Sequence, residues 1–425
     1  MTLAVFLGSL LILMLLGMPI AFALMLTGVA LMFHLDFFDA QLVAQNLLSG
    51  ADSFPLMAVP FFILAGELMN AGGISRRIID LAVSLVGHIR GGLGYVTIGA
   101  AVLLASLSGS AIADTAALAT LLVPMMRDHG YPVPRSAGLI ASGGIIGPII
   151  PPSMPFIIFG VTTNTSITSL FLAGIVPGLL MGLGLVFVWW YLAHDMEVTP
   201  QPRRSWGERG QAVVKGVWAL MLPVIILGGL RGGFFTPTEA AVVAAAYSMF
   251  VAMVIYREVN ARQLVRLLVD AARTTSTVMF LCAGALVSSY MVTLADLPQQ
   301  VTEFLGPMMN DPRLLMAAIM LLLLAVGTVM DLTPTILVMG PVLMPIAMKA
   351  GIDQTYFGIM FVLVGTLGLI HPPVCTVLNV VCGVAKISLE SATKGIWPFL
   401  LLYIVLLALF VAFPGIITVP MTWYR

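Results

Sequence analysis

Two short polar stretches hold the residues of this chain that are best suited to chemistry. The first, SGSAIADT at residues 108–115, places two serines, an aspartate and a threonine within a single octet. The second, GTVMDLTPT at residues 327–335, places an aspartate among threonines. Carboxylate, hydroxyl and freed backbone carbonyl oxygens are hard ligands that suit a small cation. Both stretches therefore indicate cation binding by oxygen atoms.

The composition of the chain is typical of a polytopic membrane protein. Of its 425 residues, 60% are hydrophobic and only 9% are charged, whereas soluble domains carry about 25% charged residues. Its 19 basic and 19 acidic residues cancel, which leaves no electrostatic basis for binding nucleic acid. The Gly-x4-Gly-Lys-Ser/Thr motif of nucleotide-binding loops does not occur, so ATP hydrolysis by this chain is excluded.

A membrane setting makes the two aspartates costly unless each has a partner. A lone charged side chain at mid-membrane costs at least ~2.5–3.5 kcal/mol. We therefore expect Asp114 and Asp331 to meet a cation, a hydrogen-bond donor or water. The alternative is that each aspartate caps the half-helix that follows it, and both roles can hold together.

Long apolar segments predict membrane-spanning helices, because a span needs ~20 apolar residues. They lie at 54–73, 170–194, 213–231, 236–256, 275–295 and 396–414. The opening run at 2–34 is interrupted by Gly17-Met18-Pro19 and predicts two short segments. Four more apolar stretches have polar or proline-rich centres: 94–126, 136–164, 314–348 and 356–384.

The stretches 94–126 and 314–348 are expected to be re-entrant hairpins whose tips are the polar stretches. If each enters and leaves on one side, 15 of the 19 basic residues fall on the same face. Lys and Arg accumulate on the cytoplasmic side of membrane proteins, so that face is predicted to be cytoplasmic. Both termini are then expected in the periplasm or exterior.

The stretches 136–164 and 356–384 are expected to be broken helices. GGIIGPIIPPS (143–153) and GTLGLIHPP (365–373) each contain consecutive prolines, which remove donors and keep the preceding residue from continuing a helix. Free carbonyls can then coordinate a cation, and the next half-helix points its N-terminus at an anion. A purely mechanical kink is the alternative. TTNTS (162–166) fits either solute binding or a simple helix end.

The two halves of the chain are related by an internal repeat. At an offset of 221 residues, GPIIPP (147–152) lies over GLIHPP (368–373) and GIVP (174–177) over GIWP (395–398). Further upstream the offset is 218, where FILAGEL (62–68) lies over FLCAGAL (280–286). Under the predicted sidedness, matching segments cross the membrane in opposite directions. This is an inverted-topology repeat, a common architecture of secondary transporters.

Across essentially its whole length, the sequence resembles the large membrane subunit of the tripartite ATP-independent periplasmic (TRAP) transporters. The motifs are GMPIAFAL (17–24), PFFILAGELM (60–69), SGSAIADTAA (108–117), GPIIPPSMPFIIFG (147–160), LFLAGIVPGLL (170–180) and LIHPPVCTVLNV (369–380). The resemblance implies an all-α polytopic membrane protein with the elevator-type ion transporter fold. It also implies sodium symport of a small organic acid anion without ATP or a further cofactor. Within the family, the sequence is similar to permeases for the sugar acid 2,3-diketo-L-gulonate.

The resemblance divides the chain into a fixed scaffold and a mobile transport domain. Scaffold segments with an arm are expected at 1–92 and 217–295, and a cytoplasmic loop at 195–216 joins the two halves of the chain. The transport domain is expected at 93–194 (hairpin 94–126, broken helix 136–164, helix 170–194) and at 296–425 (hairpin 314–348, broken helix 356–384, helix 396–414).

Site residues are implied by the same resemblance. One sodium ion would be bound by Ser108, Ser110, Asp114, Gly144 and Gly147, and a second by Gly327, Asp331, Thr333, Gly365 and Thr366. The solute would contact Gly109, Pro151, Pro152, Ser153, Asn164, Thr335, Pro372 and Pro373. His371 and Cys375 depart from the family pattern, in which a threonine-like residue and a glycine are expected. A proton relay and a plain hydrogen bond are both open for His371.

The resemblance also implies two partners in a bacterial inner membrane system. One is a small membrane subunit of about four helices, and the other is a periplasmic solute-binding protein. The alternative within transport is a stand-alone anion/sodium symporter that needs no binding protein. An intramembrane enzyme is a weaker alternative, because no catalytic constellation of Ser/His or Asp/Asp is recognisable.

Overall fold

The computed structural model describes residues 2–304, 306–372 and 375–422. The described residues form helices and connecting turns, without a β-strand. Seven described helical segments are long and apolar enough to cross a membrane. The fold is therefore that of an all-α polytopic membrane protein, as the sequence predicts. Pro373, which was expected at the solute site, lies outside the described residues.

The first half of the chain runs from α1 to α10. Its helices are α1 (Thr2–Leu15), α2 (Ile20–His34), α3 (Ala40–Ala51), α4 (Ala58–Ala71), α5 (Ile74–Val86), α6 (Gly92–Ser108), α7 (Ala111–Asp128), α8 (Val133–Gly144), α9 (Met154–Thr163) and α10 (Ile167–Ala193). A 3-10 turn, η1 (Phe54–Met57), precedes α4. The predicted hairpin is the antiparallel pair α6–α7, and the predicted broken helix is α8–α9.

The second half repeats this order. Its helices are α11 (Trp206–Arg231), α12 (Pro237–Phe250), α13 (Ala261–Leu294), α14 (Leu297–Phe304), α15 (Pro312–Gly327), α16 (Leu332–Lys349), α17 (Gln354–Gly368), α18 (Thr376–Ala385), α19 (Leu389–Ala412) and α20 (Gly415–Thr422). A π-helical turn, η2 (Val251–Ile255), extends α12, and a 3-10 turn, η3 (Gly306–Met308), follows α14. The second hairpin is α15–α16 and the second broken helix is α17–α18.

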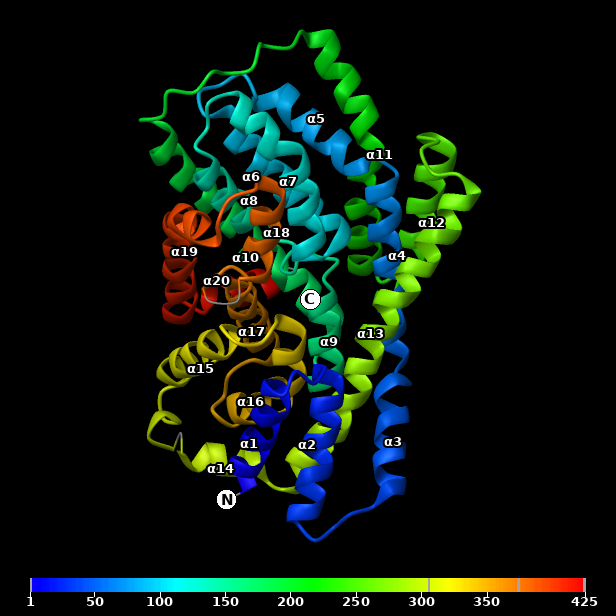
Figure 1. The fold of residues 1–425 in the computed structure, drawn as a ribbon, viewed down its shortest axis with the longest axis vertical. Coiled ribbons are helices and arrows are strands. Elements are labelled where there is room, and N and C mark those ends of the chain that lie inside the picture. The colour runs from blue at the N-terminus through cyan, green and yellow to red at the C-terminus, as the bar shows by residue number, and fades with distance from the viewer. Residues whose placement is uncertain (1, 305, 373–374, 423–425) are drawn as a thin grey trace.

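Contacts between the halves are reciprocal. The sequence offsets pair α2 with α12, α4 with α13, α7 with α16, α8 with α17, α9 with α18 and α10 with α19. In the structure α2 packs on α13 while α4 packs on α12, and α7 packs on α18 while α9 packs on α16. Likewise α8 packs on α19 while α10 packs on α17. Each contact thus has a counterpart with the halves exchanged, as a pseudo-two-fold repeat requires. Hairpin α6–α7 lies in the upper half of Figure 1 and α15–α16 in the lower half.

Two element boundaries differ from the sequence expectation. Residues 206–216, expected in the loop, form the first turns of α11, because Ser205 and Glu208 make a capping box that starts the helix there. The helix expected from residue 275 begins at Ala261, where Asn260 and Gln263 make another capping box. At about 1.5 Å per residue, α13 is longer than a ~30 Å hydrocarbon core requires. Its charged first turns therefore extend beyond the apolar span.

Candidate functional site

The tip of the first hairpin buries a carboxylate with one free oxygen. Asp114 is 3% exposed, and the Ser108 hydroxyl donates to its Oδ1 at 2.5 Å. Its Oδ2 is buried and has no hydrogen-bond partner among the described residues. Gly109, in the left-handed conformation at φ 62°, makes the turn, and Ser110 caps α7 by accepting from the Ala113 amide. The capping alternative for Asp114 therefore does not hold, since Ser110 performs that function.

The free oxygen of Asp114 faces the unwound segment of the first broken helix. A methyl group added at Gly147 would lie 2.7 Å from Asp114 Oδ2 and 3.2 Å from the Gly144 carbonyl oxygen. The same tip thus gathers Ser108, Asp114, Gly144 and Gly147, four of the five residues expected at the first cation site. A buried carboxylate oxygen beside a carbonyl oxygen, with no donor to satisfy it, is suited to a cation.

Thr115 belongs to this arrangement and was not among the expected ligands. Its side chain is fully buried, and its Oγ1 has no hydrogen-bond partner among the described residues. A methyl group at Gly144 would overlap that Oγ1 at 1.7 Å, so the hydroxyl lies directly against the glycine. The signal in the sequence was its place beside Asp114 in the same polar stretch.

The tip of the second hairpin is built differently. Asp331 is the N-cap of α16, and its Oδ1 accepts from the Leu332 amide at 3.0 Å. The capping role therefore holds for this aspartate, and it leaves the other carboxylate oxygen available for a second role. Gly327 packs against Gly368, since a methyl group added there would lie 3.3 Å from the Gly368 Cα. This contact joins the hairpin tip to the end of α17.

Other residues expected at the second cation site lie near this tip, and the Thr366 hydroxyl already has an acceptor. Thr366 is fully buried and donates to the Leu363 carbonyl at 2.7 Å. Gly365 packs against Leu332, whose Cδ1 would lie 2.3 Å from an added methyl group. Thr333 is partly buried next to the cap. Compared with the first tip, the second brings together the same kinds of residues without a fully buried free carboxylate oxygen.

The residues expected to contact the solute fall into two groups. Gly109 touches Pro152, whose carbonyl oxygen would lie 2.2 Å from an added methyl group, so the first hairpin tip and the Pro151–Pro152 break meet directly. Ser153, at that break, caps α9 by accepting from the Phe156 amide. Thr335, at the second tip, is 1% exposed and donates to the Asp331 carbonyl at 2.8 Å.

The break of the second broken helix lies between α17 and α18. Pro372 and His371 follow the end of α17, and the buried Nδ1 of His371 has no hydrogen-bond partner among the described residues. Cys375 is buried in the left-handed conformation at φ 46°. The structure thus offers the His371 ring nitrogen for an added partner, and both roles predicted for it stay open.

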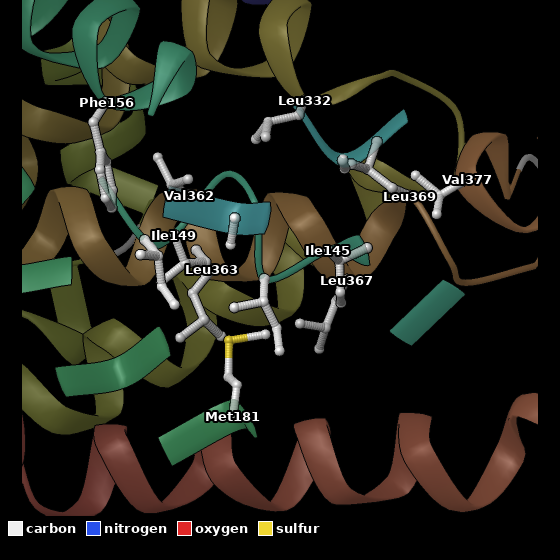
Figure 2. Close-up of a cluster of buried hydrophobic side chains, with 14 of the residues drawn as sticks. Ile145, Ile149, Phe156, Met181, Leu332, Val362, Leu363, Leu367, Leu369 and Val377 are labelled. Carbon is white, nitrogen blue, oxygen red and sulfur yellow. The ribbon is translucent and has the colours of Figure 1, made fainter. Parts of the chain in front are cut away.

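An apolar cluster joins the two broken helices. Ile145 and Ile149 from the first segment face Leu363 and Leu367 of α17, and Met181 of α10 closes the cluster from below (Figure 2). Ile145 and Ile149 are fully buried, as are Leu367 and Met181. The two broken helices therefore share one packed core.

A large cavity lies apart from the hairpin tips. Its volume is about 1210 Å³, and it is bounded by the ends of α3 and α9, the second half of α13, and α16. Of the described residues expected at the solute site, only Asn164 lines it. Asn164 ends α9 in the left-handed conformation at φ 54°. TTNTS is therefore both a helix end and part of a cavity wall.

Comparison with known proteins decides the family. Residues 7–416 match the family described as "Tripartite ATP-independent periplasmic transporter, DctM component". The chain belongs to this family. It is 56% identical to the 2,3-diketo-L-gulonate TRAP transporter large permease protein YiaN of Escherichia coli (strain K12), with 100% of both chains covered.

More distant relatives within the TRAP family differ in the substrates that their names state. The chain is 38% identical to the sialic acid TRAP transporter large permease protein SiaM of Vibrio cholerae, over 94% of this chain and 93% of that one. A solved structure, the YdaH transporter of Alcanivorax borkumensis, has the same fold at 14% identity, with a TM-score of 0.63 and 88% of each chain covered. The chain is thus a TRAP large permease, a multi-pass membrane protein and a transporter rather than an enzyme.

Proposed function

We propose that this permease imports a small organic acid anion by sodium symport, with 2,3-diketo-L-gulonate as the candidate solute. The observation that carries sodium coupling is the buried Asp114 carboxylate, whose Oδ2 has no partner among the described residues. A carboxylate left in that state would lose several kcal/mol of solvation. A bound Na+, which the carbonyl of Gly144 and the hydroxyl of Thr115 would also coordinate, would compensate the Asp114 carboxylate for this lost solvation.

The proposed solute site lies where the hairpin tips meet the broken helices. Pro152 and Gly109 touch, so an ion that orders the first tip also orders the break against which an anion would lie. The α9 half-helix begins at that break, and its N-terminus is favourable for negative charge. Sodium binding and solute binding are thereby coupled through one contact.

The proposed transport step is an elevator movement. Hairpins α6–α7 and α15–α16, together with both broken helices, would move as one body. Hairpin α6–α7 packs on α8, hairpin α15–α16 packs on α17, and the two broken helices share the apolar cluster of Figure 2. Each net positive charge carried inward gains about 2.3 kcal/mol per 100 mV of inside-negative potential. This energy, added to the sodium gradient, would replace ATP, and no resident cofactor is required.

We further propose two partners, a small membrane subunit and a periplasmic solute-binding protein, in a bacterial inner membrane. The isethionate TRAP transporter permease protein DctMQ of Oleidesulfovibrio alaskensis matches 94% of this chain over only 63% of its own length. A relative with additional sequence supports a further subunit beside this one. The termini would face the periplasm, because the predicted sidedness puts the basic clusters in the cytoplasm.

The decisive experiment is solute uptake into proteoliposomes. They would contain this chain with its small subunit, under an inward sodium gradient without ATP, with and without the binding protein. Uptake of 2,3-diketo-L-gulonate that needs both sodium and the binding protein is expected. Uptake without the binding protein would instead support a stand-alone anion/sodium symporter, and uptake without sodium would overturn the coupling proposal.

A further inference from the structure

Arg209, in the first turns of α11, has a buried guanidinium edge without an acceptor. Its Nε and Nη2 atoms are both buried, and neither has a hydrogen-bond partner among the described residues. These two nitrogens form an edge of the guanidinium group that can bind a carboxylate or a phosphate through two parallel hydrogen bonds. A cation held in this way without an acceptor is costly, so the edge is suited to an added anion.

The groups next to Arg209 in the chain do not supply that acceptor. The neighbouring carboxylate, Glu208, belongs to the capping box, in which its Oε2 accepts from the Ser205 amide at 2.7 Å. No ion pair within the described residues includes Arg209. By contrast, the half-buried Arg135 donates to the Gly395 carbonyl at 3.1 Å. Within the described part of the chain, Arg209 is the only arginine with buried nitrogens that lack an acceptor, which points to a ligand from outside the chain.

Arg209 lies at the depth of the lipid headgroups. The apolar span expected at 213–231 begins one helical turn after it, which is about 6 Å along the axis, and the headgroup layer on each side of a bilayer is about 5–7 Å thick. The ring centroid of Trp206 lies 5.2 Å from the Arg209 Cζ. Trp206 is 81% exposed, as tryptophans at the membrane interface often are. The start of α11 lies at the top of Figure 1 with α5, on the face that the positive-inside rule assigns to the cytoplasm.

An exposed apolar stripe continues from this point along α11. Val213, Val217 and Val224 are all exposed. They follow Trp206 at successive steps of 7, 4 and 7 residues, a spacing that places side chains on one face of a helix. Acyl chains can therefore lie along this stripe beneath a headgroup that contacts Arg209.

We propose that the start of α11 binds the phosphate of an anionic phospholipid in the cytoplasmic leaflet. The Nε–Nη2 edge of Arg209 donates to two phosphate oxygens, and the acyl chains follow the valine stripe. An anionic headgroup is favoured over a zwitterionic one, because the guanidinium then gains the counter-charge that the described residues do not provide. Since α11 belongs to the proposed scaffold, the lipid would anchor the part of the chain that stays fixed during transport.

Lipid titration of the purified full chain tests the proposal. The thermal midpoint of delipidated protein in dodecyl maltoside is measured against the anionic lipid POPG, the zwitterionic lipid POPC and glycerol 3-phosphate, a soluble phosphate without acyl chains. Arg209→Gln is the test variant. Arg266→Gln is the matched control, because Arg266 is an exposed arginine in the charged first turns of α13. The titrations are repeated with the small membrane subunit bound.

We expect POPG to raise the wild-type midpoint at lower concentrations than POPC, and glycerol 3-phosphate to leave it unchanged. Arg209→Gln should weaken the apparent affinity for POPG about tenfold or more, because it loses two charge-assisted hydrogen bonds. Arg209→Lys should recover part of this loss, since it keeps the charge but not the bidentate edge. Arg266→Gln should change the affinity less than about twofold. Without lipid, Arg209→Gln should be no less stable than the wild type, because it removes a buried charge that has no acceptor.

POPG titrations that superimpose for the wild type and Arg209→Gln would overturn the proposal, as would an equal loss of affinity in Arg266→Gln. Equal stabilisation by glycerol 3-phosphate would overturn it by assigning the site to a soluble phosphate. Loss of POPG binding on addition of the small subunit would assign this face of α11 to that subunit instead. A lower midpoint of Arg209→Gln in lipid-free detergent would also count against the proposal, because the guanidinium would then have a partner within the protein.

Discussion

Gly147 offers the sharpest test of the first cation site, because an alanine there adds a single methyl group beside the proposed ion. That methyl group would lie 2.7 Å from Asp114 Oδ2 and 3.2 Å from the Gly144 carbonyl oxygen. Overpacking of this kind costs about 1–3 kcal/mol. If the cost falls wholly on the ion-bound state, sodium affinity should drop about 5- to 150-fold.

The assay is the thermal midpoint of the purified chain as a function of NaCl, with choline chloride keeping ionic strength constant. Bound sodium stabilises the wild type by RT ln(1 + [Na+]/Kd), about 2.7 kcal/mol at one hundred times Kd. In Gly147→Ala the thermal midpoint should begin to rise only at a correspondingly higher NaCl concentration. Gly99→Ala is the control: Gly99 lies in α6 of the same hairpin, and an added methyl group meets nothing within 4 Å.

Two outcomes would refute this reasoning. The first is a sodium titration in Gly147→Ala that superimposes on the wild type. The second is a loss of stability in choline alone that fully accounts for the difference, because the methyl group would then disturb packing and not an ion. Gly99→Ala should keep the wild-type titration, with up to about 1 kcal/mol of added helix stability.

Three further predictions concern single contacts. Asp331→Asn should keep the cap of α16 but weaken the sodium dependence of uptake. Asp331→Ala should in addition lose about 1 kcal/mol of stability, because the cap is removed. Equal sodium dependence in Asp331→Asn and the wild type would contradict the second cation site. Gly395→Ala should lower the thermal midpoint strongly, because the added methyl group would lie 2.0 Å from the Pro134 carbonyl oxygen. An unchanged midpoint would show that α8 and α19 can separate freely. Tyr403→Phe should destabilise the chain by about 1–3 kcal/mol, since the Tyr403 hydroxyl donates to the buried Ser142 carbonyl at 2.6 Å. Amide hydrogen exchange at the end of α8 should become faster in this variant, and unaltered exchange would argue against the hydrogen bond.

Much of the fold follows from local sequence signals. The Gly-Ser turn at 109–110 and the consecutive prolines at 151–152 interrupt helices by backbone chemistry alone, and the structure breaks the helices there. The six long apolar segments match six of the seven described candidate spans, and the seventh is α16 of the second hairpin. The start of α11 at Trp206 was missed because a capping box outweighed the polar composition of the segment. Such signals act within a few residues, so they can be recognised in the sequence without knowledge of the tertiary contacts.

The sequence by itself determined the element types, the repeat, the family resemblance and the carboxylates that matter. Only the tertiary structure decided that Asp331 caps a helix while Asp114 keeps a free buried oxygen, because that difference depends on Gly147 and Thr115 packing around one tip. It also decided the position of the large cavity beside Asn164, whose walls come from α3, α9, α13 and α16. Residues so far apart in the chain meet only after the two halves pack against each other, and no local pattern encodes that meeting.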